Sequence, residues 1–505
     1  MKEKLKRLDL FSMIVPAIAV IVLCGLFMAF PEAAGNVLEV IRNFLGVTIG
    51  SYYMLIGLGI LLLTLGIAFS KYGDIRLGNC DKPIYNNFQW GAMIFSSTMA
   101  ADIVYYAFIE WALYGGEQHV ADMGGIQKWA STYPLFHWGP IPWGFYVVLA
   151  IAFGFMIHVR GRNRQKFSEA CRPLLGAAVD GPAGKIIDLL AVFTLLAGTA
   201  TTFSLATPLI SAAASRLLGI PNSAGLTIVI LLLIATMYTT AVLFSFKGIS
   251  AMASICMWLF FALLAWVFLG GGEVVYIIET GISAIGNMVQ NFIGLSTWMD
   301  PLRETGFVQN WTIYYWAYWL VWCVATPFFI GVISKGRTIR NMILGTYISG
   351  LMGTFVSFIV FGNYGLSLQM RGTMDVIGAI SGGADIPETI LSILSTLPGD
   401  TAVYILLIVT MFAFYSTTFD SLTMVVSMYS YRNLGPEEHP HKAVCAFWSV
   451  VFIIFPIGLI FSENSLRNLQ SISIIAAFPI SIVVIMIIIS FFKDAKRYLK
   501  GDPQK

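Results

Sequence analysis

Residues 310–322 read Asn310-Trp311-Thr312-Ile313-Tyr314-Tyr315-Trp316-Ala317-Tyr318-Trp319-Leu320-Val321-Trp322, so seven of these thirteen positions are aromatic. Trp316, Trp319 and Trp322 recur at every third position, and on a helix they rise along one slowly drifting face. Indole faces inside a membrane protein suit a cation without a hydrogen-bond donor, such as a quaternary ammonium group. The alternative is an aromatic belt at the membrane interface. A belt explains one or two tryptophans at a helix end better than three spread over about 9 Å of helix rise.

The composition is that of a polytopic membrane protein. Of the 505 residues, 57% are hydrophobic and 11% are charged, whereas soluble domains carry roughly 25% charged residues. The mean hydropathy is +0.79. Apolar segments long enough to cross about 30 Å of hydrocarbon begin near Phe11, Tyr52, Gln89, Ile141, Ile186, Leu226, Ala251, Trp311, Asn341, Thr401, Ala443 and Ser471. The sequence therefore predicts an all-α integral membrane protein with twelve transmembrane helices.

The distribution of basic residues predicts the orientation. Twelve spans place both termini on one side of the membrane. If that side is the cytoplasm, 24 of the 30 Lys and Arg residues are cytoplasmic, and six of them lie within residues 160–185. This bias follows the positive-inside rule, so we expect a multi-pass protein of the plasma (inner) membrane bilayer with both termini cytoplasmic. The net charge of +3 reflects this topology and indicates no nucleic-acid partner.

If the first two predicted spans are peripheral, spans 3 to 7 and spans 8 to 12 form two groups of five. We expect residues 1–88 to hold an N-terminal cytoplasmic segment and two peripheral helices, 89–271 the first repeat, 272–310 an external amphipathic linker, 311–492 the second repeat, and 493–505 a short basic cytoplasmic tail. Because five is an odd number, two such repeats must have inverted topology, which is a common transporter design.

Three segments indicate where a ligand would bind. Residues 96–102 in span 3 are mostly small and end in an acid, Asp102, and Pro327 in span 8 removes a backbone amide just after the aromatic stretch. Such broken helices mark binding sites in transporters. Span 4 opens with a second aromatic group, residues 136–146, in which Trp143 and Tyr146 share a helix face. For span 4 alone, anchoring at the interface explains the aromatic residues equally well.

The sequence carries no motif of an enzyme or of a metal site. The six cysteines show no paired or metal-type spacing, and they are Cys24, Cys80, Cys171, Cys256, Cys323 and Cys445. No nucleophile elbow and no phosphate-binding loop occurs. We therefore expect no enzymatic activity, no disulfide, no bound metal and no cofactor.

Residues 310–319 resemble the signature of the betaine/carnitine/choline transporter (BCCT) family, an aromatic stretch that begins with Trp-Thr and continues to Phe/Tyr-Trp-x-Trp-Trp. Only the penultimate position departs, with Tyr318 in place of tryptophan. The basic residues 333–340 are similar to the loop that follows in the family, and residues 136–146 resemble its span 4. The resemblance implies twelve spans around a five-plus-five inverted-repeat (LeuT-like) core, often in a homotrimer.

The resemblance also implies a substrate site at mid-membrane. Carried over position by position, it is an aromatic box of Trp138, Trp143, Tyr146 and Trp319, with Trp322 and Tyr318 along the adjoining pathway toward the cytoplasm. The implied substrate is a quaternary ammonium compound of the choline, glycine betaine or carnitine class, moved by alternating access. The alternatives on the same core are an amine or amino-acid carrier and a sensor that binds such ligands without moving them.

Asp102 bears most directly on the coupling ion. Asp102 falls at a position where the sodium-coupled betaine carriers of the family have a glycine. The proton-coupled choline carriers resemble this chain in having an aspartate there. An acid at membrane depth usually marks an ion path or proton relay; hydrogen bonding to its neighbours is the structural alternative. Phe414, Thr417 and Thr418 resemble the positions that supply sodium ligands in the sodium-dependent branch. Ion-independent exchangers have an arginine where this chain has Cys256. We rank proton coupling first, sodium second and exchange third.

Two other buried acids have structural interpretations. Glu110 matches a family acid at the outer end of span 3, and we expect it to hold helix geometry through hydrogen bonds. Asp188 lies near the cytoplasmic start of span 5, where we expect a helix-end role.

Overall fold

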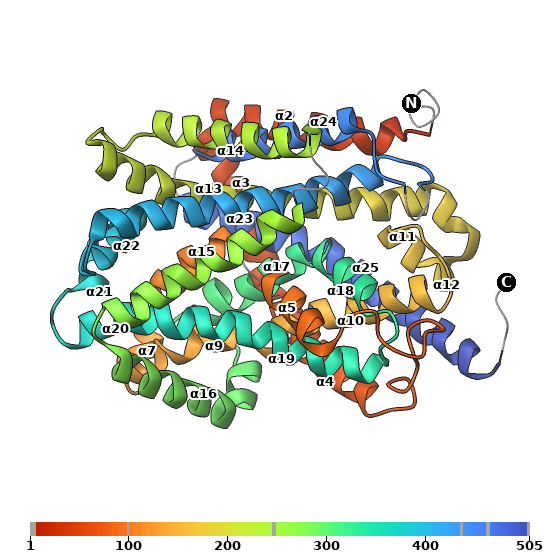
Figure 1. The fold of residues 1–505 in the computed structure, drawn as a ribbon, viewed down its shortest axis with the longest axis horizontal. Helices are drawn as coiled ribbons and strands as arrows, with labels where there is room; N and C mark the ends of the chain where they lie inside the picture. Colours follow the sequence, from red (N-terminus) through yellow and green to blue (C-terminus); the bar gives the residue numbers. More distant parts are fainter. Residues whose placement is uncertain (1–6, 98–99, 245–248, 435–437, 461–464, 502–505) are drawn as a thin grey trace.

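The computed structural model describes residues 7–97, 100–244, 249–434, 438–460 and 465–501, and most of its long helices run roughly along one direction (Figure 1). Within these ranges, extended pairing is limited to two isolated bridges, Leu8 with Tyr431 and Arg76 with Thr338. The all-α prediction is therefore confirmed.

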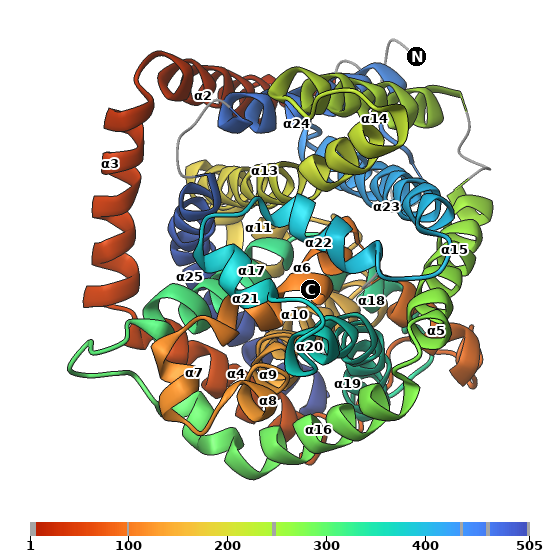
Figure 2. The same cartoon turned by 90° about the vertical axis from the view of Figure 1, so that its left-hand side faces the viewer.

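Four elements precede the region predicted as the first repeat, and Figure 2 shows α3 at the outer edge of the molecule. Pro31 occupies the first turn of α3, where its missing N–H has no helical partner to lose. These elements are α2 (Leu10–Ala29), α3 (Pro31–Arg42), the π-helix η1 (Asn43–Thr48) and α4 (Ser51–Ala68).

The region predicted as the first repeat contains a broken span. α5 and α6 meet at 69°, and Ala100, directly before α6, has an extended backbone. The break coincides with the small-residue run, of which Thr98 and Met99 lie outside the described residues. The elements are α5 (Asn87–Ser97), α6 (Ala101–Gly115), α7 (Gln118–Asp122), α8 (Ile126–Trp129), α9 (Thr132–His137), α10 (Pro140–His158), α11 (Phe167–Ala170), α12 (Arg172–Leu175), η2 (Gly176–Asp180), α13 (Pro182–Leu218), α14 (Ala224–Phe244) and α15 (Ile249–Gly270).

The second region begins after α16 (Val274–Thr297), which bends 109° away from α15 and lies along the lower edge in Figure 2. A second broken span follows, because α17 and α18 meet at 57° and Pro327 lies in the first turn of α18. The elements are η3 (Val308–Thr312), α17 (Ile313–Trp322), α18 (Thr326–Ile333), α19 (Ile339–Ser357), η4 (Phe358–Gly362), α20 (Asn363–Met370), α21 (Val376–Ser381), α22 (Ile386–Leu394), α23 (Asp400–Tyr429), α24 (Lys442–Ile460) and α25 (Ser465–Leu499).

Length and composition mark this as a multi-pass membrane protein. Among the described residues, eight helices are long and apolar enough to cross a membrane, and the number rises to eleven if each bent pair is one span. The segment Ala224–Thr240 is apolar but shorter. It corresponds to the sixth predicted span. The count of twelve and the inverted repeat stay predictions.

Glycines let the large aromatic side chains approach neighbouring helices closely. A Cβ added at Gly350 of α19 would lie 2.5 Å from the indole of Trp143, and one added at Gly57 of α4 would lie 3.1 Å from the indole of Trp316. Trp143 and Trp316 are fully buried. Each indole therefore occupies space that only a glycine leaves open.

Replacing Gly350 with alanine should lower the free energy of unfolding by about 1–3 kcal/mol, because the new methyl group overpacks a well-filled core. Thermal unfolding of the purified protein in detergent measures the effect. The matched control is Gly59→Ala in α4, where an added Cβ meets nothing within 4 Å. That variant should be unchanged or slightly stabilised, since alanine favours a helix. Equal melting of both variants with the wild type would contradict the packing argument.

Another pair of glycines brings α10 and α18 into backbone contact. A Cβ added at Gly331 would lie 2.9 Å from the backbone nitrogen of Gly154. Beside this contact the rings of Phe153 and Phe328 stack with centroids 3.6 Å apart and planes 8° apart. Shape-matched contacts of this kind fix two helices in one relative position.

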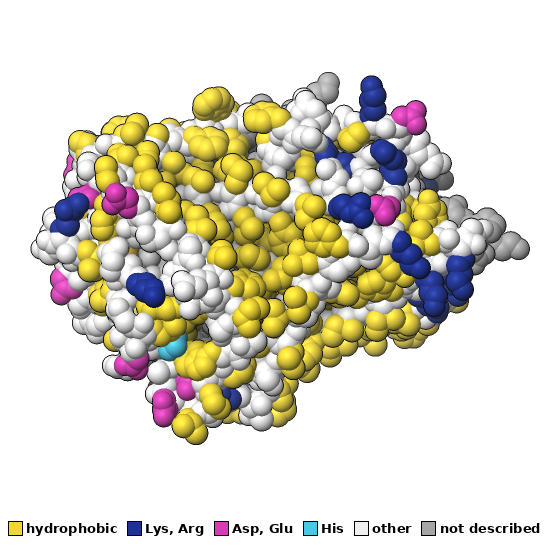
Figure 3. Space-filling model, turned by 90° about the horizontal axis from the view of Figure 1, so that it is seen from below, with side chains coloured by type: hydrophobic (Ala, Val, Ile, Leu, Met, Phe, Trp, Pro, Cys, Tyr) yellow, Lys and Arg dark blue, Asp and Glu magenta, His cyan; other side chains and the backbone are white. Residues whose placement is uncertain are grey.

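Basic residues gather at one end of the molecule, together with both ends of the described chain. Figure 3 shows most Lys and Arg side chains of that face at its right-hand end, where α11 and α12 lie in Figure 1. Arg160 forms an ion pair with Asp494 near the end of α25 (2.9 Å). Lys166 pairs with Asp188 of α13 (3.3 Å) with both side chains buried. Asp188 thus forms a buried ion pair in addition to lying near the start of its helix.

Candidate functional site

A cavity of about 530 Å³ lies among α5, α6, α10, α15, α17, α18 and α23. It is bordered by all ten residues that the sequence analysis named for substrate and coupling ion, namely Asp102, Trp138, Trp143, Tyr146, Tyr318, Trp319, Trp322, Phe414, Thr417 and Thr418. These positions are separated by up to about three hundred residues in the chain, and the fold brings them to one cavity.

Trp319 is the centre of the aromatic part of this cavity. Its ring centroid lies 5.5 Å from Trp138, 5.5 Å from Trp143 and 5.0 Å from Tyr146. The planes are tilted by 69°, 59° and 58°. Rings inclined to one another in this way turn their faces in different directions, so several faces can border one cation.

Trp316 does not line the cavity, although it begins the three-residue series of tryptophans. The centroid of its ring lies 5.3 Å from that of Phe136, and Gly57 of α4 also approaches the indole closely. Residues three apart are rotated by about 60° on an α-helix, so the face drifts as it rises. Only the second and third members of the series, Trp319 and Trp322, border the cavity.

The indole N–H groups divide into paired and unpaired donors. Trp138 donates to the carboxylate oxygen Oε2 of Glu110 at 2.7 Å. Tyr315 donates to the same oxygen at 2.7 Å, and Tyr114 donates to Oε1 at 2.6 Å. Glu110 thus joins α6, α17 and the residue directly after α9, as expected for an acid that holds helix geometry. Among the described residues, the N–H groups of Trp143, Trp319 and Trp322 have no partner.

Asp102 lies in the first turn of α6 and is 4% exposed. The N-terminal end of a helix favours a negative charge. The hydroxyl of Tyr318 donates to Oδ2 of Asp102, and the hydroxyl of Thr202 lies 3.4 Å from the same oxygen. Among the described residues the other oxygen, Oδ1, has no hydrogen-bond partner.

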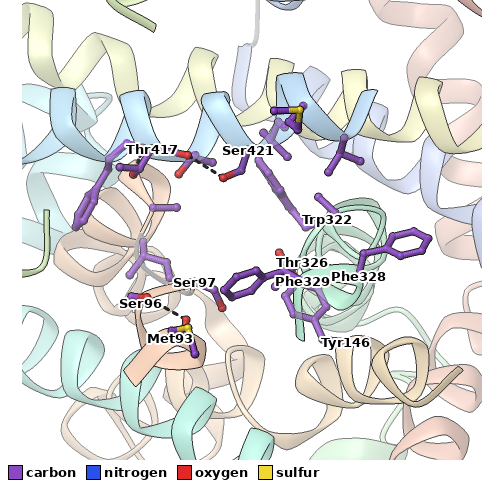
Figure 4. A pocket seen from close by; sticks show the side chains of 18 of the residues that line it. Met93, Ser96, Ser97, Tyr146, Trp322, Thr326, Phe328, Phe329, Thr417 and Ser421 are labelled. Carbon is purple, nitrogen blue, oxygen red and sulfur yellow. Dashed lines mark hydrogen bonds between the residues drawn. The ribbon is translucent and has the colours of Figure 1, made fainter. Parts of the chain in front are cut away.

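Hydroxyl groups border the cavity on two sides. Figure 4 shows Thr417 and Ser421 on α23 across the cavity from Ser96 and Ser97 on α5. Thr417 donates to the backbone oxygens of Ala413 and Phe414, each at 3.2 Å. The hydroxyl proton of Thr417 is therefore engaged by the backbone of its own helix. The oxygen lone pairs of such a hydroxyl can still bind a hard cation.

The described residues contain no cluster of three His, Cys, Asp or Glu side chains that could hold a metal ion. Cys256 borders the cavity, with its sulfur 3.7 Å from Oγ1 of Thr417. This position therefore contributes a neutral thiol where an arginine would place a permanent charge.

The cavity extends toward the basic end of the molecule. Its lining includes Gln165, within the basic segment, and Met428, one residue before the end of α23. Tyr106, one turn after Asp102 on α6, and Tyr314, one turn before Tyr318 on α17, are buried and share a hydrogen bond of 2.7 Å.

Sequence reasoning missed several residues of the cavity region, and two of them bear on the site. Thr202 of α13 pairs with Asp102 and Tyr318, and its only local signal is a threonine-rich stretch, residues 199–202. Phe329 of α18 points into the cavity near Thr326 (Figure 4). Apolar residues on a membrane helix carry no mark that distinguishes a cavity wall from a lipid-facing surface.

Comparisons with known proteins identify the family. Residues 11–500 match the model for the BCCT, betaine/carnitine/choline family transporter. The chain is 30% identical over 485 residues to a probable glycine betaine transporter of Desulfitobacterium hafniense (94% of each chain). It is 29% identical over 499 residues to the glycine betaine transporter OpuD of Bacillus subtilis (97% of this chain, 94% of the relative). A carnitine transporter of Acinetobacter baumannii is 26% identical over 432 residues (84% and 78%).

The match covers nearly the whole chain, including both broken helices and the aromatic cavity. It confirms the resemblance drawn from the signature and the expectation of a transporter, not an enzyme. This protein belongs to the betaine/carnitine/choline transporter family.

Proposed function

We propose that the protein is a secondary-active transporter of quaternary ammonium compounds, of the choline, glycine betaine or carnitine class. One observation carries the proposal: one cavity gathers an aromatic box, a buried acid and a hydroxyl-rich wall. The printed names of the relatives, glycine betaine and carnitine transporters, support the same substrate class.

The aromatic box is sufficient for the affinity that transport needs. Each desolvated ring face contributes roughly 0.5–2 kcal/mol to binding a cation. Three or four faces, here Trp138, Trp143, Tyr146 and Trp319, then allow micromolar-to-millimolar binding after ordering costs. The ring faces of the box offer no oxygen or nitrogen acceptor to the N–H donors of a primary amine, so the box itself favours a quaternary ammonium group.

Proton coupling through Asp102 is our preferred mechanism. The carboxyl borders the same cavity as the box, so a proton held on Asp102 and a substrate held in the box would cross the membrane together. Sodium coupling through Phe414, Thr417 and Thr418 ranks second. Exchange ranks third because Cys256 supplies no permanent positive charge.

We further propose the membrane arrangement expected from the sequence. The protein would cross the plasma membrane twelve times around a five-plus-five inverted repeat, within the segment boundaries given above, as a homotrimer. The basic end, which carries Arg160, Lys166 and both ends of the described chain, would face the cytoplasm. The cavity mouth at Gln165 would then open inward.

Reconstitution into proteoliposomes tests the proposal. Labelled choline, glycine betaine and carnitine are supplied outside with an imposed proton gradient, a sodium gradient or neither. We expect uptake against a concentration gradient when the proton gradient is imposed. Binding without uptake would indicate a sensor, and uptake restricted to primary amines would refute the aromatic-box account. Accumulation with the sodium gradient alone would move the coupling assignment to α23.

A further inference from the structure

Three side chains from three helices meet beside the cavity. The hydroxyl of Tyr318 (α17) donates to Oδ2 of Asp102 (α6). The hydroxyl of Thr202 (α13) lies 3.4 Å from Oδ2 and 3.2 Å from the Tyr318 hydroxyl. All three residues are at least nine-tenths buried. We call Tyr318 and Thr202 the hydroxyl clamp.

The hydroxyl clamp treats the two carboxyl oxygens differently. Both hydroxyl contacts go to Oδ2, whereas Oδ1 is buried without a hydrogen-bond partner among the described residues. A buried oxygen that carries charge and has no partner is unfavourable. A proton on Oδ1 removes that charge and leaves Oδ2 as the carbonyl oxygen that accepts from Tyr318.

Thr202 is held in place by hydrogen bonding between α13 and α23. The hydroxyl of Tyr415 (α23) donates to the backbone oxygen of Thr202 at 3.3 Å, and it shares a further hydrogen bond of 3.2 Å with Thr207. The stretch of α13 that carries Thr202 is therefore fixed against α23, the helix that forms the hydroxyl-rich wall of the cavity.

We infer that Tyr318 and Thr202 are positioning residues for Asp102, and that they make Oδ1 the atom that takes up and releases the coupled proton. On uptake an O–H bond forms at Oδ1, and on release its electron pair stays on that oxygen. The inference rests on the proposed proton coupling through Asp102. By this inference Tyr318, the one departure from the family signature, positions Asp102 and does not act along the substrate pathway.

The surroundings make the pH dependence interpretable. Among the described residues, the titratable groups that interact with Asp102 from neighbouring elements are phenols: Tyr314 and Tyr318 from α17, Tyr146 from α10 and Tyr415 from α23. Free phenols titrate near pH 10. A change in transport between pH 5 and pH 8 that involves this group of residues therefore reports on Asp102.

The test is the pH profile of proton-driven choline uptake in proteoliposomes. Tyr318→Phe keeps the ring and removes the donor, so the ionised carboxyl loses a hydrogen bond. We expect the midpoint of the profile to move to higher pH by about one unit. Thr202→Val should move it in the same direction by less, and Thr202→Ser should restore the wild-type midpoint.

The matched control is Tyr314→Phe, one turn earlier on α17. It also removes a buried hydroxyl, but that hydroxyl pairs with Tyr106 at 2.7 Å and not with Asp102. Its midpoint should equal that of the wild type. If Tyr314→Phe moved the midpoint as far as Tyr318→Phe does, the shift would come from a general change in packing, and the inference would be overturned.

A second readout separates this inference from the proposed function. Infrared difference spectra of the purified protein follow the carboxyl C=O band with pH, and the band that disappears in Asp102→Asn is assigned to Asp102. We expect the band to titrate at higher pH in Tyr318→Phe and Thr202→Val. An unshifted band in both variants overturns the clamp even if uptake is normal. A shifted band in a protein that takes up no trimethylammonium compound supports the clamp and refutes the proposed function.

Discussion

Replacing Trp319 with alanine should abolish high-affinity uptake of trimethylammonium compounds, whereas Trp319→Phe should retain part of it. Trp319 is the ring that contacts the other three members of the box. Its loss removes one cation–π face and the packing that orients the remaining faces. We expect a cost of roughly 2–3 kcal/mol, which is about 30- to 150-fold in Kd. Equilibrium binding of labelled substrate and initial uptake rates measure it.

Trp316→Phe is the matched control for this prediction. Trp316 lies on the same helix and is equally buried, but it packs against Phe136 away from the cavity. Its substitution should lower the melting temperature and leave Kd within about threefold of the wild type. Equal losses of affinity in the Trp316 and Trp319 variants would show that the effect is one of folding and not of the box.

Replacing Asp102 with asparagine should uncouple transport from the proton gradient. Asparagine has the same size but binds no proton, so the substrate would equilibrate across the membrane without concentrating. With the membrane potential held at zero, an inside-alkaline gradient of one pH unit should drive roughly tenfold accumulation in the wild type with one proton per substrate. The same gradient should give a ratio of about one in the variant. The accumulation ratio at steady state is the measurement.

Asp102→Gly provides a second comparison, because it places at this position the residue type of the sodium-coupled branch. If Asp102→Gly left the pH dependence unchanged, the coupling assignment would be wrong. Accumulation that instead followed the sodium gradient and was lost in Thr417→Ala would assign coupling to the hydroxyl-rich wall.

The sequence was sufficient to predict which residues surround the cavity, because the family signature carries position-specific information. Trp138 and Trp319 were named from two aromatic stretches nearly two hundred residues apart, and both line the cavity. The two broken helices also followed from local chemistry. Pro327 cannot continue the hydrogen-bond ladder of the preceding turn, and small residues around Ala100 leave the backbone open to a bend.

Side-chain orientation and long-range pairing could not be predicted in the same way. The repeat of Trp316, Trp319 and Trp322 predicts a drifting face, but it does not predict that Trp316 packs against Gly57 and Phe136 and away from the cavity. The contact between Thr202 and Asp102 joins residues one hundred positions apart. No local pattern encodes it, because a threonine in a membrane helix usually bonds its own backbone.

The backbone contact between Gly154 and Gly331 has a mechanical consequence. Because no side chain separates α10 from α18 at these two glycines, and because the rings of Phe153 and Phe328 stack beside them, the two helices cannot move apart there without opening a void in the core. We therefore expect any change in the width of the cavity near Gln165 and Met428 to come from α5 and α23, with Trp143 of α10 keeping its place relative to α18.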